Sequence, residues 1–201
     1  MKLAPLCTLL VVAALAAGCQ TTSIRSAWFD TDFAGPPFRK VVVTADFPTT
    51  TDNRTFEDAF AQKLRDAGVD AIAGHTVRLV DDGTSDASFV TAVVNTGAQG
   101  LLFVRLLGVD TRTQVSTTMV PGGVAWGRGG WGTATTRVPV QQITQYDLAT
   151  VETKMFDVKT KQVVWAATTT TFNPRSVERE LPAFADLVIG QLKARGVVAG
   201  P

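Results

Sequence analysis

Two hydrophobic periodicities alternate along the first half of the chain and predict strands and helices in a regular order. Val41-Val42-Val43 is a continuous apolar run, typical of a strand that is buried on both faces. Apolar residues then recur at spacings of three and four up to Gly68, which predicts an amphipathic helix with a glycine at its end. The expected strands and helices alternate at residues 40–47, 53–68, 71–79, 87–96 and 101–109.

The second half of the chain predicts a hairpin and a helix. Residues 111–136 are rich in Thr and Gly, and we expect a long loop there. Residues 143–158 and 162–171 predict two long antiparallel strands, and an apolar stripe over residues 177–192 predicts a C-terminal helix. The expected fold class is therefore α/β (α+β). A mixed sheet with a β-α-β-α-β start is followed by a long antiparallel hairpin and by a C-terminal helix packed on the sheet.

The first 18 residues have the outline of a secretory signal peptide. Lys2 precedes an apolar run over residues 3–17, which is shorter than the roughly 20 residues that a transmembrane helix needs. Residues 15–19, Leu-Ala-Ala-Gly-Cys, resemble the lipobox of bacterial lipoproteins, in which the peptidase cuts before the cysteine and the thiol is acylated. The alternative is an ordinary secretory signal that is cut near Ala17. In both cases the chain is expected to leave the cytoplasm.

The lipobox resemblance implies an anchor and a compartment. Cys19 would be acylated, and two or three acyl chains hold a protein at a membrane far more firmly than one. Gln20 is not the Asp that typically retains such lipoproteins at the inner membrane, so we expect an outer-membrane anchor with the domain facing the periplasm. The expected division is a signal peptide at 1–18, the lipidated cysteine and a tether at 19–39, and one globular α/β domain at 40–198.

Composition argues against several classes of function. The other cysteine, Cys7, lies in the predicted signal peptide, so the processed chain would have no disulfide or cysteine zinc site. Without Lys2, 18 Lys and Arg balance 18 Asp and Glu, which gives no general attraction to nucleic acid. His75 is the only histidine, and the sequence G-x-S-x-G is absent. We expect no enzyme activity, no metal and no cofactor.

Three further patterns have ordinary explanations. Residues 81–86 look in part like a calcium loop but lack its terminal Glu, so a solvated turn is expected. Glu57 and Asp58 lie on a predicted helix face, where solvated charge is the default interpretation. Residues 127–132 satisfy G-x-G-x-x-G, but extended chain rather than a helix is expected after them, which argues against a dinucleotide site.

The glycine-rich loop also contains the candidate partner or ligand surface. Trp126, Arg128 and Trp131 stand among its glycines. Tryptophans in such a setting can stack on sugars, enter a membrane interface or fill a pocket on a partner, and they can also fold back on their own sheet. Both alternatives are open from the sequence.

Most of the segment 40–198 resembles a broad group of small periplasmic lipoproteins. The segment Asp157-Val158-Lys159-Thr160-Lys161-Gln162-Val163-Val164-Trp165 looks like the D-x-x-T-x-x-x-V-W hairpin of the DUF4136 type, a domain of unknown function. Gly97-Ala98-Gln99-Gly100 is similar to a step in which that group usually has Asp where this chain has Gln99. A more distant similarity is to the curli-secretion lipoprotein and to penicillin-binding-protein activator lipoproteins. The resemblance implies an α/β fold built for protein contacts and no catalytic residue.

The leading functional hypothesis is therefore a non-enzymatic lipoprotein that binds a protein partner during assembly or maintenance of the cell envelope. The alternative is a glycan- or lipid-binding module that uses Trp126 and Trp131. A hydrolase that depends on His75 is a third hypothesis.

Overall fold

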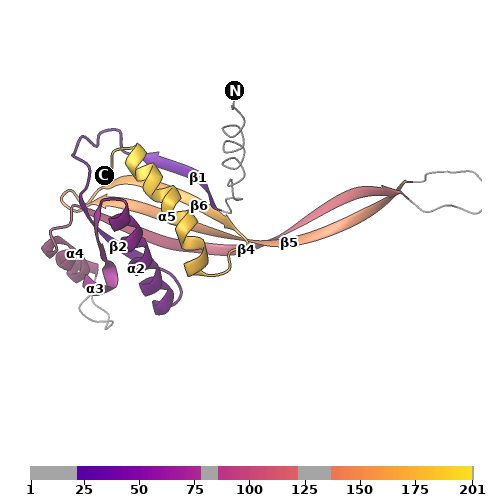
Figure 1. The fold of residues 1–201 in the computed structure, drawn as a ribbon, viewed down its shortest axis with the longest axis horizontal. Helices are drawn as coiled ribbons and strands as arrows, with labels where there is room; N and C mark the ends of the chain where they lie inside the picture. The colour runs from indigo at the N-terminus through magenta and orange to yellow at the C-terminus, as the bar shows by residue number, and fades with distance from the viewer. Residues whose placement is uncertain (1–21, 78–85, 122–136, 201) are drawn as a thin grey trace, which may run out of the picture.

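A six-stranded mixed sheet runs through the computed structural model, which describes residues 22–77, 86–121 and 137–200 (Figure 1). The strand order is β1-β6-β5-β4-β2-β3. The strands are β1 (Thr22–Phe29), β2 (Lys40–Asp46), β3 (Asp70–Ala73), β4 (Gly100–Pro121), β5 (Arg137–Asp157) and β6 (Val163–Phe172). The helices are α2 (Thr50–Asp66), α3 (Gly74–Val77), α4 (Asp86–Asn95) and α5 (Val177–Ala194).

The predicted fold class is confirmed. Strand β2 runs parallel to β3 and β4, and β4, β5, β6 and β1 follow one another in antiparallel pairs. Val41, Val42 and Val43 of β2 are all fully buried, as the apolar run predicts, because both faces of the sheet are covered at this strand.

Helices α2 and α5 cover one face of the sheet (Figure 1). Helix α2 begins after Thr49, whose side chain accepts a hydrogen bond from the Asp52 N–H, and it is followed by Gly68 in the left-handed region at φ 88°. Its apolar stripe reaches the core through Phe60 and Leu64, both fully buried. The predicted C-terminal helix is likewise present. Its buried stripe consists of Leu181, Phe184, Ala185, Val188, Ile189 and Leu192.

A smaller apolar cluster lies on the opposite face of the sheet. Val93 of α4 and Val77 of α3 pack there with Val42 of β2 and Ala98. The predicted strand at 71–79 is shorter than expected, because β3 ends at Ala73 and the next four residues form α3.

The predicted loop at 111–136 is wrong for all of its residues that the structure describes. Residues 111–121 continue β4, and β5 begins at Arg137, so β4 is 22 residues long and β5 is 21. The Thr-rich sequence favours strand, but no face of this part is buried, so no apolar alternation marks it. Beyond the helices, β4 and β5 continue together as a narrow twisted ribbon (Figure 1). We call residues 106–121 and 137–147 the arm.

Part of the predicted tether is also structured. Residues 22–29 form the edge strand β1, which pairs with β6. Phe29 and Phe33 pack on the core, whereas Trp28 is 53% exposed.

Candidate functional site

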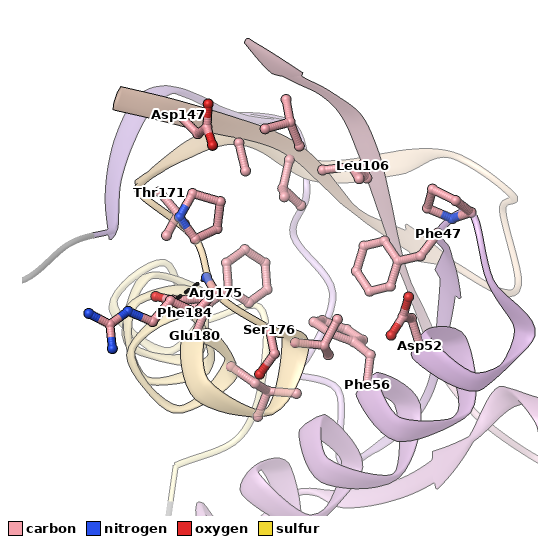
Figure 2. Close-up of a pocket in the computed structure, with 17 residues that line it drawn as sticks. Phe47, Asp52, Phe56, Leu106, Asp147, Thr171, Arg175, Ser176, Glu180 and Phe184 are labelled. Carbon is pink, nitrogen blue, oxygen red and sulfur yellow. Dashed lines mark hydrogen bonds between the residues drawn. The ribbon is translucent and has the colours of Figure 1, made fainter. Parts of the chain in front are cut away.

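A cavity of about 310 Å³ lies where the arm leaves the sheet, between the starts of α2 and α5 (Figure 2). Its wall is mainly apolar. Phe47 follows β2, Phe56 comes from α2 and Phe184 from α5, and Figure 2 shows these rings around the cavity with Leu106 of β4 opposite. The remaining apolar wall consists of Pro48, Val109, Ala149, Val151, Pro174, Val177 and Leu181.

The aromatic wall is held by contacts between its rings and by one side-chain clamp. The Phe47 and Phe56 rings meet edge to face with centroids 5.1 Å apart, and the Phe56 and Phe184 centroids are 5.8 Å apart. The Asn53 side chain accepts from the Phe47 N–H at 2.6 Å and donates to the Phe47 carbonyl at 3.4 Å. Asn53 therefore fixes the turn that aims Phe47 at the cavity.

Polar groups lie at the rim. The Thr111 hydroxyl donates to Asp147 Oδ1 at 2.7 Å. The Asp147 N–H donates to the side-chain Oδ1 of Asn173 at 2.9 Å, and the Asn173 N–H donates to the Asp147 carbonyl at 2.8 Å. Asn173 stands at φ 47° just after β6. The Arg175 N–H donates to Glu180 Oε1 at 3.3 Å, and the Arg175 guanidinium points away from the cavity (Figure 2). Because these polar groups are hydrogen-bonded to one another, the surface that the cavity presents to a ligand is mainly apolar.

The pKa of Glu178, at the start of α5, is lowered from its ordinary value of 4.5. Its carboxylate accepts hydrogen bonds from its own backbone N–H and from the Ser176 hydroxyl. This carboxylate is fully exposed, so it belongs to the start of the helix and not to the cavity.

A β-bulge marks the root of the arm on β4. Leu106 pairs with Val151 and Gly108 pairs with Thr150, so Leu107 is an extra residue on β4. The pairs Leu106–Val151 and Val109–Ala149, on either side of the bulge, both line the cavity. The helix-covered face of the sheet therefore continues into one face of the arm.

The expectation that Glu57 is solvated is wrong. The Glu57 side chain is only 3% exposed, and it accepts hydrogen bonds from the backbone N–H groups of Ala45 at 2.9 Å and His75 at 2.6 Å. His75 Nδ1 lies 3.0 Å from the same carboxylate, and Nε2 lies 3.5 Å from the exposed Asp58. Glu57 thus ties β2, α2 and α3 together, and His75, one-quarter exposed, is part of that tie. His75 lies on α3, not on a strand or in a turn.

The site residues predicted from the sequence lie outside the described residues. This holds for the lipidation residue Cys19, for Trp126, Arg128 and Trp131, and for the G-x-G-x-x-G segment. The acidic turn over residues 81–85 is also outside them. The positions of these residues relative to the cavity are therefore not described.

Sequence reasoning missed the cavity, although two signals for it were present. The first signal is the pair of aromatic residues Phe56 and Phe184, which lie within the predicted helices at 53–68 and 177–192. Their meeting depends on the packing of α2 against α5, which no local pattern predicts. The second signal was the Asn173-Pro174 step, which ends β6 and returns the chain across the cavity rim.

Within the described residues, no group of three or more His, Cys, Asp and Glu side chains is arranged to hold a metal ion. None of the helices in that part of the chain is long and apolar enough to cross a membrane.

Comparisons with known proteins give no family. No protein-family model matches the chain, and no curated protein matches it. Among solved structures, the chain is similar to a PelC dodecamer from Paraburkholderia phytofirmans, at 16% identity over 87% of this chain and 98% of that one, with a TM-score of 0.43. A variant of the same protein gives 15% identity, coverage of 87% and 99%, and a TM-score of 0.43. Lipoprotein GNA1162 from Neisseria meningitidis gives 11% identity, coverage of 77% and 98%, and a TM-score of 0.41. Similarity at this level says nothing about what this chain binds.

Proposed function

We propose that this chain is a non-enzymatic lipoprotein of the bacterial cell envelope, anchored to the outer membrane through acylated Cys19, that binds a protein partner during envelope assembly or maintenance. The anchor is supported by the sequence at residues 15–19 and by the uncharged Gln20 after the cysteine.

The observation that carries the binding role is the surface of the arm. Ten large apolar side chains are exposed among the described residues, and six of them lie on the arm. They are Leu107, Val109, Val115, Met119, Val140 and Ile143. Exposed apolar side chains gathered on one projecting element are typical of an interaction surface, whereas single ones scattered over a protein are ordinary.

The anchor is tested by replacing the thiol. The Cys19→Ser variant is expected to lose acylation and to be released from the membrane fraction, because no acyl chain then holds it. Fractionation of cell envelopes and mass spectrometry of the N-terminal peptide measure both effects. A variant that stays acylated and membrane-bound would overturn the lipoprotein assignment.

The binding role is tested by crosslinking in intact envelopes followed by mass spectrometry. The wild-type chain is expected to give reproducible protein crosslinks at the arm. Repeated recovery of the chain alone and monomeric would contradict a protein-binding role.

A second candidate is binding of an apolar ligand such as an acyl chain, and the cavity at the root of the arm favours it. Leu106 and Phe184 face each other across an apolar space with few polar groups, which is the character of a lipid site. The Leu106→Trp variant, which fills the cavity, is expected to lose binding of a fluorescent fatty acid. Equal binding by this variant and by the wild type would exclude the cavity as the site.

The original form of this alternative, with Trp126 and Trp131 as the ligand surface, stays a prediction. Replacing both with Ala is expected to abolish glycan or lipid binding while the melting temperature stays close to wild type. A large loss of stability would instead indicate that the tryptophans pack on their own domain.

A further inference from the structure

Among the described residues, neither strand edge of the arm has a neighbouring strand. On β4, pairing with β2 ends at Arg105, which lies opposite Asp46. On β5, pairing with β6 ends at Leu148, opposite Phe172. From there the described arm is a two-stranded ladder that continues to the pair Pro121–Arg137. The outward N–H and C=O groups of both strands are therefore left without a strand partner over about 11 residues or more, a length of roughly 35 Å.

The β4 edge lacks most of the protection that open edges usually carry, whereas the β5 edge contains Pro139. Natural edge strands avoid unwanted pairing through lysines and other charges, through prolines or by being short. Residues 113–121 and 138–146 contain no Asp, Glu, Lys or Arg, although charged residues make up 18% of the chain. The β4 edge from residue 106 to 120 also contains no proline. The sequence of the arm permits pairing where most edges prevent it.

The charges of the arm match a second copy better than a charged partner. Asp110 and Arg112 on β4, and Arg137 and Asp147 on β5, sum to zero. An arm of this kind does not attract an acidic or basic surface from a distance, and it does not repel an identical arm. An anionic lipid headgroup or a nucleic acid is therefore not favoured.

Hydrocarbon alone does not suit the arm either. Every backbone polar group must be paired inside a bilayer, and an open edge leaves such groups unpaired. The cavity-side face of the arm also mixes Val115 and Ile143, which are 57% and 65% exposed, with Thr113, Gln141 and Gln145. A strand from another chain satisfies the backbone and covers Val115 and Ile143 at the same time.

We propose that the arm pairs edge to edge with the arm of a second copy of this chain. The pairing adds backbone hydrogen bonds along β4 or β5 and buries the exposed apolar residues of both arms. It rests on the proposed function, since it names the protein partner. The geometry permits it, because the arm projects well beyond the helices and both of its edges are open to approach (Figure 1). An isolated two-stranded ribbon is only marginally stable in water, so each arm also gains order from the contact.

Analytical ultracentrifugation of the acylated, processed chain in density-matched detergent tests the pairing. The wild type is expected to sediment as an oligomer at micromolar concentration. A Val115→Lys/Met119→Lys variant is expected to dissociate at a concentration about tenfold higher or more, because the two lysines added to each arm repel those of the other arm. A wild type that is monomeric throughout, or a variant that assembles like the wild type, would overturn the proposal.

The matched control places the same two charges on the body. Val90 and Val94 of α4 are 36% and 49% exposed, so Val90→Lys/Val94→Lys makes the same chemical change away from the arm. This variant is expected to sediment like the wild type. If it dissociates as strongly as the arm variant, the interface is not the arm and the proposal fails.

A photo-crosslinking amino acid at position 115, activated in intact envelopes, separates this proposal from the function on which it rests. A product of twice the chain mass that contains only this chain is expected. A product with a different protein would overturn pairing between copies and still support a protein-binding lipoprotein. A product with lipid alone, or none at all, would count against both.

Discussion

Strands β4 and β5 run through both the arm and the helix-covered part of the sheet, which we call the body, but their apolar side chains are largely buried in the body and largely exposed in the arm. Within the body, Leu102 and Met155 face each other fully buried beneath the helices. In the arm, the corresponding cross-strand pair Val115–Ile143 is more than half exposed. Burial therefore explains the sequence of the body but not that of the arm. Burial within the fold therefore sets no requirement for the length of these strands in the arm.

The largest effect should come from the body. Phe60→Ala is expected to lower the free energy of unfolding by about 3–5 kcal/mol, because Phe60 of α2 is fully buried in the main apolar core, where it contacts Phe184 of α5. Chemical denaturation monitored by circular dichroism measures the loss. The matched control is Phe172→Ala, since that ring is 45% exposed and should cost under about 1 kcal/mol. Similar losses for the two variants would mean that burial does not distinguish Phe60 in the core from Phe172 at the end of β6.

Loss of the buried Glu57 carboxylate should have the second-largest effect on stability. Glu57→Ala is expected to cost about 2–4 kcal/mol, because the Ala45 and His75 N–H groups lose their acceptor. Asp58→Ala is the control, because its side chain is 64% exposed and only its 3.5 Å contact with His75 is lost. A thermal or denaturant curve for each variant decides the matter. If Glu57→Ala were as stable as Asp58→Ala, the tie between β2 and α3 would be unimportant.

A smaller effect of opposite sign is expected at Thr153. Its hydroxyl is buried in β5 and has no hydrogen-bond partner among the described residues. Thr153→Val keeps the shape and removes the unpaired oxygen, so it should raise the free energy of unfolding by about 1 kcal/mol. Differential scanning calorimetry would show a higher melting temperature. A lower one would mean that the hydroxyl has a partner such as a bound water.

The smallest stability effect belongs to the arm. Val115→Ala and Ile143→Ala are each expected to change the free energy of unfolding of the monomer by less than about 0.5 kcal/mol, because both side chains are largely in solvent. Denaturation at concentrations below the association range measures this. A loss of more than about 2 kcal/mol from either variant would show that the arm packs on the rest of the domain in solution.

Sequence patterns predicted the body because its buried positions produce apolar runs and apolar stripes along the sequence. Val41 to Val43 read as a strand covered on both faces, and the stripes of α2 and α5 carried their spacing. The same reasoning failed for the arm, because an element with both faces in solvent carries no apolar alternation.

The candidate sites divide along a similar line. The motif that ends at Cys19 is contiguous and can be read directly. The role of Glu57 depends on backbone groups 12 residues before it and 18 residues after it, which no local pattern reveals. The cavity needs three strands and two helices to meet, so only the folded chain shows it.

Leu107, the extra residue at the root of the arm, affects the direction of the arm separately from its strand pairing. Removing Leu107 would leave every other cross-strand partnership of β4 and β5 intact, since Leu106 and Gly108 already pair with adjacent residues of β5. It would nevertheless remove the local bend and the added twist that a bulge gives a strand. A single deletion would thus change the direction of the whole ribbon, and Leu107 is the one exposed apolar side chain that the arm would lose. The chain can therefore adjust the direction in which it presents the arm through one position, while the exposed apolar residues farther along the arm keep their cross-strand partners.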